Sequence, residues 1–190
     1  MKSNPNYINQ EDFDKILAAI PRLNIRKWDD NDIQYLMKIL YHMALRPMEG
    51  IKLKKEDFDM DNRMVYLGKT KTSTSDRAVI PKAFLMDLDG YLWTKDEGRL
   101  FPGLTYRTFW VWCKRLGIDL SIEAWLPRNR ERMKENTVGH IFRKSWGKDA
   151  LEELGFDKID VISSHLRHKK PSMTFDHYLK GNIKKVHDTI

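Results

Sequence analysis

The sequence contains almost no cysteine and no long hydrophobic run. Cys113 is the only cysteine among 190 residues, so an internal disulfide and a cysteine-rich zinc site are both excluded. No apolar segment approaches the roughly 20 residues that a helix needs to cross a bilayer, and the polar first 15 residues lack the apolar stretch of a signal peptide. The mean hydropathy is -0.61. These features predict a cytoplasmic protein with no membrane partner.

Positive charge is in excess. The chain carries 34 Lys and Arg against 27 Asp and Glu, a formal net charge of +7, and its pI is near 9.4. Such a surplus suggests a polyanionic partner, although solubility alone also accounts for it. The 41% of hydrophobic residues is enough for a core and excludes a wholly disordered chain. The length fits one domain with at most a short appendage.

Apolar periodicity predicts a mostly helical chain. Residues 1–9 are expected to form a frayed leader, and Pro47 is well placed to begin a short helix. Gly117 and Gly155 are expected to end the helices that precede them. The other helices expected from their spacing and caps are 12–20, 30–45, 82–93, 105–116, 138–154, 158–166 and 172–179.

Two apolar segments have the character of strands rather than helices. Residues 64–67 and 78–80 are separated by the polar stretch 68–76, which predicts two strands joined by a loop. The polar stretch 121–136 fits either an exposed helix or a loop. The predicted fold class is therefore mainly α with a small antiparallel β-sheet, an α+β domain.

Several polar residues stand at positions where the amphipathic pattern does not explain them by packing in the core. His140 and Arg143 are three apart, so on a helix they share one face with about 5 to 6 Å between their Cβ atoms and can address one small anion together. The full set of such candidates in chain order is Arg46, Lys69, His140, Arg143, His168 and Tyr178.

These residues lie in motifs that resemble those of the tyrosine recombinases, or phage-type integrases, whose catalytic domain is related to that of the type IB topoisomerases. Each motif alone is a weak signal, but all of them occur in the family order and at family-like separations. The resemblance covers roughly residues 30–180. Its pieces are Leu45-Arg46-Pro47-Met48-Glu49, Gly68-Lys69 followed by Arg77-Ala78-Val79-Ile80-Pro81, His140-Ile141-Phe142-Arg143, and His165-Leu166-Arg167-His168 through Tyr178.

The resemblance implies a domain division and shows two departures. A leader and short helix would occupy residues 1–28, the catalytic domain residues 29–180, and a C-terminal tail residues 181–190. Family members usually carry an N-terminal helical domain that clamps DNA, so this chain would be an excised catalytic domain or a minimal version. Arg167 stands where the family usually has glycine, which leaves the path of the turn before His168 open.

The resemblance also implies a chemistry, in which DNA strands are cleaved and rejoined through a covalent 3′-phosphotyrosine at Tyr178. Arg46 and Arg143 would stabilise the extra charge on the non-bridging phosphate oxygens, because guanidinium stays charged and matches two oxygens at once. His140 and His168 would add hydrogen-bond donors or exchange a proton with the nucleophile.

One further role follows from the same resemblance. Lys69 would protonate the departing 5′ oxygen as general acid, with Lys71 in the same loop as the competing candidate. Spacing alone suggests a role for Glu49, which lies three residues after Arg46 and so on the same helical face. It would either orient an arginine or histidine of the site or form a local salt bridge.

The implied partner is double-stranded DNA, bound by a homo-tetramer whose protomers are weakly associated or monomeric without DNA, at the host nucleoid. Neither a metal nor another cofactor is implied, and zinc on His165, His168 and His177 is disfavoured because no cysteine or carboxylate completes a ligand set. A DNA-binding module without turnover, or topoisomerase-like relaxation, is the alternative function. The expected DNA contacts are Lys71, Arg77, Arg128, Arg130, Arg132 and Lys144. For the three arginines within residues 128–132, a solvent-exposed face without DNA contact is an equally good interpretation.

Overall fold

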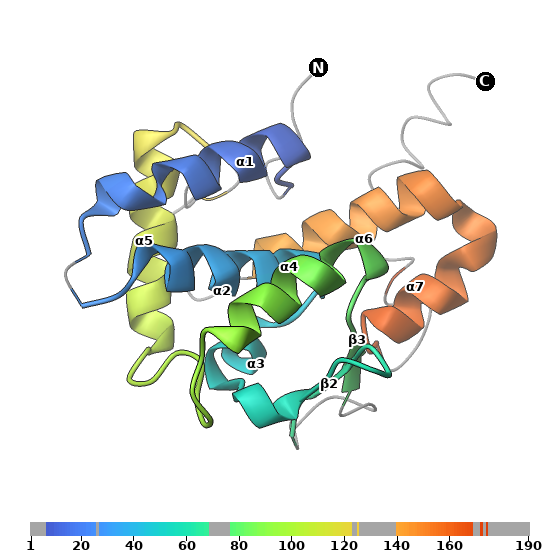
Figure 1. The fold of residues 1–190 in the computed structure, drawn as a ribbon. Helices are drawn as coiled ribbons and strands as arrows, with labels where there is room; N and C mark the ends of the chain where they lie inside the picture. Colours follow the sequence, from blue (N-terminus) through green and yellow to red (C-terminus); the bar gives the residue numbers. More distant parts are fainter. Residues whose placement is uncertain are drawn as a thin grey trace.

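The computed structural model describes residues 7–25, 27–68, 77–122, 125, 140–168, 172 and 174. In this part of the chain, helices surround one large hydrophobic core and a small sheet lies at one edge (Figure 1), which confirms the predicted fold class. None of the helices within it is long and apolar enough to span a membrane. The elements are α1 Gln10–Ala19, η1 Ile20–Leu23, α2 Asp30–His42, α3 Pro47–Lys52, η2 Lys55–Asp57, β1 Phe58–Asp59, β2 Met64–Tyr66, β3 Arg77–Val79, α4 Lys82–Trp93, α5 Tyr106–Asp119, α6 Ile141–Leu154, η6 Phe156–Lys158 and α7 Ile159–His165.

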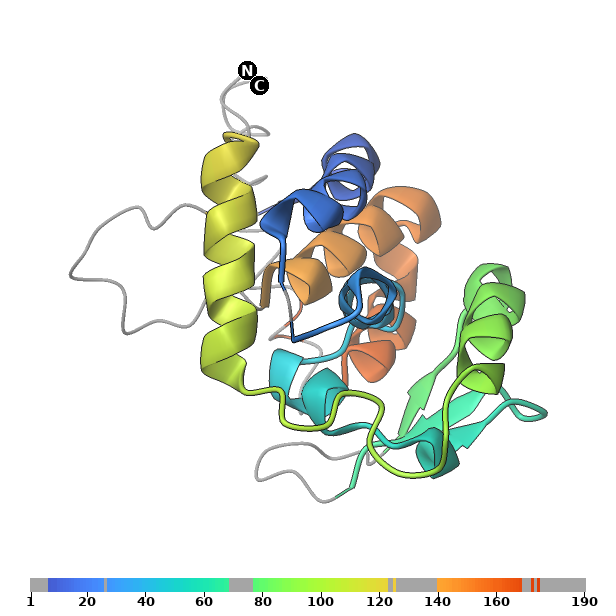
Figure 2. The same ribbon diagram turned by 60° about the vertical axis from the view of Figure 1, so that its left-hand side comes forward.

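Helix α2 is the central element. Asp29 caps its N-terminus by accepting a hydrogen bond from the backbone N–H of Asn31 at 2.8 Å. The helix contacts α3, α4 and α6, and it lies between α5 on one side and α4 with the sheet on the other (Figure 2). Aromatic rings join it to its neighbours: Tyr41 stacks on Phe13 of α1 with ring centroids 4.2 Å apart.

The segment before α1 is bound to α6. Ile8 is fully buried, its backbone N–H donates to Oγ of Ser145 at 2.8 Å, and the Tyr7 hydroxyl donates to Asp149 at 2.6 Å. The prediction of a frayed leader over residues 1–9 is therefore wrong for residues 7–9, because the Ile8 side chain belongs to the hydrophobic core and Asn9 caps α1. Residues 1–6 lie outside the described part.

The sheet has three antiparallel strands in the order β1-β2-β3. Val65 pairs with Ala78 of β3 and with Phe58 of β1. The two predicted strands are thus confirmed as β2 and β3. Strand β1 was not predicted, because a two-residue strand has no alternation to detect. The loop between β2 and β3 begins at Gly68, which has a positive φ of 65°.

Gly117 does not end α5, as the sequence suggested, but lies inside it. A Cβ added at this position would stand 2.9 Å from the Cβ of Trp125, which is fully buried. The glycine is therefore required by close packing between α5 and the segment at Trp125. Gly90 of α4 has no atom within 4 Å of such a Cβ and supplies a natural comparison.

Replacing Gly117 by alanine should lower the free energy of unfolding by about 1–3 kcal/mol, since overpacking forces the backbone or Trp125 to move. Gly90→Ala should instead raise it by about 0.5–1 kcal/mol, because alanine loses less entropy than glycine in a helix interior. Urea unfolding of both variants measures the two effects. A Gly117→Ala protein as stable as the wild type would contradict the packing argument.

Candidate active site

Arg46 lies between two helices rather than at the end of one. Helix α2 ends at His42, so the predicted helix 30–45 is too long, and Arg46 is the N-cap of α3 with extended backbone (φ -73°, ψ 147°). Pro47 begins α3 as predicted. The Arg46 backbone N–H donates to Oε2 of Glu49 at 2.8 Å. This contact fixes the direction in which the Arg46 side chain leaves the chain.

The Glu49 carboxylate is buried and binds two guanidinium groups. Its Oε1 accepts from Nη1 of Arg46, and its Oε2 accepts from Nη2 of Arg167, both at 2.7 Å. The side chains of Glu49 and Arg167 are 4% and 1% exposed, whereas that of Arg46 is 25% exposed. Burial alone would raise the pKa of Glu49, but the Arg167 charge and the hydrogen bonds from Arg46 outweigh it and hold that pKa below its usual value.

Arg143 joins α6 to the segment that carries Arg46. Its Nη1 donates to the backbone carbonyl of Ala44 at 2.9 Å, and the residue is 5% exposed. Ala44 has a positive φ of 49°, a conformation that costs energy for any residue with a Cβ. The contact therefore helps to hold a strained turn two residues before Arg46.

His140 stands at the N-cap of α6, half-buried. Burial lowers its pKa, and the positive charges of Arg143, Arg46 and Lys144 lower it further, while Glu49 opposes them. These charged groups come from two separate stretches of the chain. The neutral form is favoured, which leaves one ring nitrogen able to accept a proton.

The turn after α7 explains how the chain reaches His168. The backbone N–H of His168 donates to the carbonyl of Ser163 at 3.0 Å, and that of Arg167 to the carbonyl of Ser164 at 2.9 Å. This pair of bonds is a Schellman motif, which places one residue in the left-handed conformation. Arg167 is that residue, with φ 51°. Arginine thus follows the backbone path that glycine adopts readily.

His168 is half-buried and is held by Thr174. Its Nδ1 lies 2.7 Å from Oγ1 of Thr174, itself fully buried. Which of the two atoms donates depends on the histidine tautomer. The bond joins the turn at the end of α7 to the segment that leads toward Tyr178.

His165 packs within the protein. Its ring stacks on Trp146 of α6 with centroids 4.0 Å apart. Burial, together with the charges of Arg167 and Arg143, lowers its pKa to about 4. The stacking supports a structural role for this histidine.

The pKa of His165 predicts acid sensitivity. The pKa of this histidine is 6.5 in an ordinary setting and about 4 in the folded protein. Between these two pH values the unfolded chain therefore binds a proton at His165 that the folded chain does not bind. Stability should therefore be retained above pH 6.5 and lost progressively as the pH falls toward 4. His165→Phe keeps a ring against Trp146 but cannot titrate, so its melting temperature should fall less over this range. Equal slopes in both proteins would contradict this account.

Several candidates from the sequence fall outside the described residues. Among the DNA-contact candidates that are described, Arg77 is exposed on β3 and lies 5.2 Å from the ring centre of Tyr66, and Lys144 is half-buried on α6. The structure joins Arg46 to Glu49 by an ion pair and brings Arg143 to the carbonyl of Ala44, two residues before Arg46. His140 stands three residues before Arg143, at the N-cap of α6. The candidates outside the described residues are Lys69, Lys71, Arg128, Arg130, Arg132, His177 and Tyr178.

Arg167 was not predicted as part of the site. The sequence shows only an arginine directly after a helix, with no sign of its partner, because Glu49 is 118 residues away. One signal in the sequence could have indicated a role for Arg167. A charged residue stands directly after a helix, where the left-handed turn that ends many helices favours glycine.

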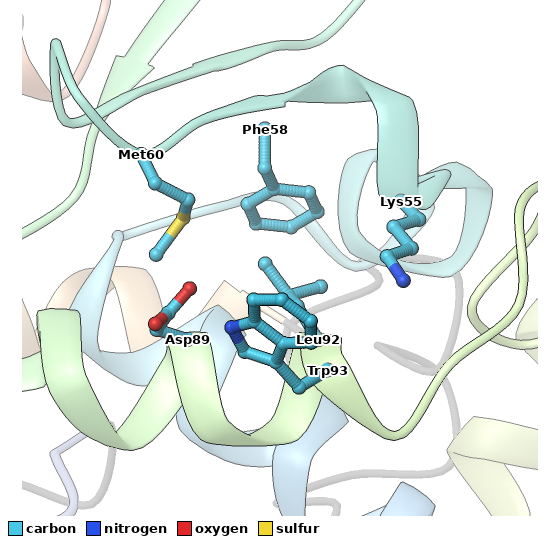
Figure 3. A pocket seen from close by; sticks show the side chains of 6 residues that line it. All are labelled: Lys55, Phe58, Met60, Asp89, Leu92 and Trp93. Carbon is cyan, nitrogen blue, oxygen red and sulfur yellow. The ribbon is translucent and has the colours of Figure 1, made fainter.

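A separate pocket of about 240 Å³ lies between α4 and the segment that leads into β1. Four apolar side chains line it together with Lys55 and Asp89 (Figure 3), and they are Phe58, Met60, Leu92 and Trp93, the last of which is 81% exposed. None of the arginines or histidines described above lines it.

Comparison with known proteins identifies the fold. The sequence matches the Phage integrase family over residues 6–185. It is 27% identical over 164 residues to the tyrosine recombinase XerA of Thermococcus kodakarensis, covering 80% of this chain and 54% of that one. The catalytic domain of bacteriophage HP1 integrase superimposes with a TM-score of 0.64 at 20% identity, covering 90% of this chain and 85% of that domain.

A structure of the XerH site-specific recombinase bound to its difH substrate, in a pre-cleavage complex, superimposes with a TM-score of 0.63 at 21% identity, covering 91% of this chain and 50% of that one. The fold is thus that of the integrase and recombinase catalytic domains. The chain belongs to the phage integrase family. It spans about half the length of the curated relatives that it matches, between 40% and 57%.

Proposed function

We propose that this chain is the catalytic domain of a site-specific DNA recombinase, which cleaves and rejoins strands through a 3′-phosphotyrosine at Tyr178. The observation that carries the proposal is that the buried carboxylate of Glu49 holds Arg46, while Arg143 of α6 reaches the carbonyl of Ala44, two residues before Arg46. The relatives support it, since they are tyrosine recombinases by name.

The arginines would act on the scissile phosphate. In its pentacovalent transition state, extra negative charge develops on two non-bridging oxygens, where donors already in place lower the barrier. Arg46 is the more exposed of the two guanidinium groups. Glu49 uses one of its N–H groups, which leaves the others for a phosphate.

Tyr178 would attack phosphorus. A phenol with a pKa of about 10 is protonated at neutral pH, so it needs a base, and a histidine such as His140 or His168 would take its proton. Lys69 would return a proton to the 5′ oxygen as it leaves. The phosphotyrosyl bond is itself a diester, so a 5′ hydroxyl can reverse the step without an outside source of energy.

The remaining features of the proposal concern assembly and location. We expect residues 29–180 to form the catalytic domain proper, after a short helical leader and before a tail over residues 181–190. The domain would work on double-stranded DNA as a homo-tetramer, associated with DNA in the cytoplasm. The expected phosphate contacts are Lys71, Arg77, Arg128, Arg130, Arg132 and Lys144.

Because the target sequence is unknown, the test should use a pool of nicked duplexes with randomised sequence. In such substrates the strand beyond the cleavage point diffuses away, so a covalent protein–DNA adduct accumulates. We expect a covalent adduct that survives denaturing electrophoresis. Peptide mapping should place the attached nucleotide on Tyr178, and sequencing of the captured DNA should reveal one common motif. Failure of every duplex to form an adduct would overturn the proposal, and DNA binding without adducts would favour a binding module.

A further inference from the structure

Arg167 forms the most deeply buried ion pair in the described part of the chain. We infer that Arg167 is a positioning residue for Arg46, acting through the carboxylate of Glu49 that both guanidinium groups share. The inference rests on the proposed strand cleavage, because Arg46 needs to be positioned only if it meets a phosphate.

Glu49 is held from both sides. Its Oε1 is taken by Arg46, while its Oε2 accepts from the backbone of Arg46 and from Nη2 of Arg167. The other terminal nitrogen of Arg167 donates to the carbonyl of His165 at 3.3 Å. The carboxylate therefore has one part-exposed partner, Arg46, and one buried partner, Arg167, at the end of α7.

The charges give Arg167 a second effect. A buried carboxylate paired with Arg46 alone would cancel the charge that Arg46 must present to a phosphate. With Arg167 added, the three groups carry a net charge of +1, and Arg46 is the more exposed of the two cations. Arg167 thus allows Glu49 to orient Arg46 without neutralising it.

The backbone at Arg167 points to the same conclusion. At φ 51° the residue stands in the left-handed region, where glycine is accommodated without steric cost and arginine is not. The two hydrogen bonds that define the turn are made by backbone groups. The side chain adds a longer hydrogen bond of 3.3 Å to the carbonyl of His165 and the 2.7 Å ion pair with Glu49.

Arg167→Gly is consequently a sharp test, because it keeps the turn and removes only the guanidinium. We expect adduct formation with a DNA captured by the randomised pool to slow at least about tenfold, as for loss of one group that supports the transition state. The dissociation constant for that DNA should stay within about twofold, since many other phosphate contacts dominate affinity. Arg167→Lys should recover part of the rate, and low guanidinium chloride should speed Arg167→Gly but not the wild type.

The outcomes separate the two proposals. A wild-type chain that forms no adduct overturns the proposed function and this inference with it. If the wild type forms adducts and the Arg167→Gly protein forms them equally fast, the inference alone is overturned. It is also overturned if the rate and the DNA affinity of Arg167→Gly fall in parallel, because Arg167 would then contact the DNA itself. If Arg167→Gly does not fold, Arg167→Asn is judged by the same criteria, because asparagine also tolerates the left-handed conformation.

Discussion

Replacing Tyr178 by phenylalanine should abolish the covalent protein–DNA adduct. Phenylalanine keeps the ring and removes only the oxygen that would bond to phosphorus, so no other step of the proposed reaction can compensate. The measurement is denaturing electrophoresis of the variant and the wild type with the same nicked duplex. DNA affinity should change little, because affinity comes mainly from contacts to other phosphates.

Tyr66→Phe is the matched control for that experiment. Tyr66 is 40% exposed on β2 and lies beneath Arg77, so the same loss of a hydroxyl there should leave adduct formation intact. An adduct that persists in Tyr178→Phe would show that another residue is the nucleophile. Loss of the adduct in both variants would point to a general effect of removing tyrosine hydroxyls.

Glu49→Gln should lower the free energy of unfolding at neutral pH by about 3–5 kcal/mol. Removing one partner of a buried ion pair leaves the other uncompensated, and here two guanidinium groups, Arg46 and Arg167, would face one neutral amide. Urea unfolding measures the loss. Glu152→Gln on α6 is the control. Glu152 forms an ion pair with Lys148, and its side chain is 63% exposed. Exposed ion pairs of this kind contribute at most about 1 kcal/mol.

The same variant predicts a pH dependence. The pKa of Glu49 is lowered in the folded protein from an ordinary value of 4.5, so the carboxylate stabilises the fold fully above pH 4.5 and loses this effect as the pH falls through the folded pKa. The difference in stability between wild type and Glu49→Gln should therefore be largest near neutral pH and shrink below pH 4.5. A constant difference from pH 7 to pH 3 would show that packing, not charge, accounts for the effect.

Local patterns predicted most helices because their causes are local. The helix over residues 82–93 was predicted with the bounds that α4 has, since Pro81 precedes it and the apolar spacing ends at Trp93. Gly117 illustrates the opposite case. Its role depends on Trp125, which packs on it across a turn, so the sequence suggested a helix end where the structure has a close contact.

The sequence by itself determined which residues are candidates for the site, because their motifs resemble those of one family in order and spacing. These candidates are Arg46, Lys69, His140, Arg143, His168 and Tyr178. Only the tertiary structure decided how these groups are held. Arg143 reaches the carbonyl of Ala44 and Arg167 reaches Glu49 across 99 and 118 residues. Periodicity and capping act within a few residues, whereas such contacts exist only once α6 has packed against both α2 and α7.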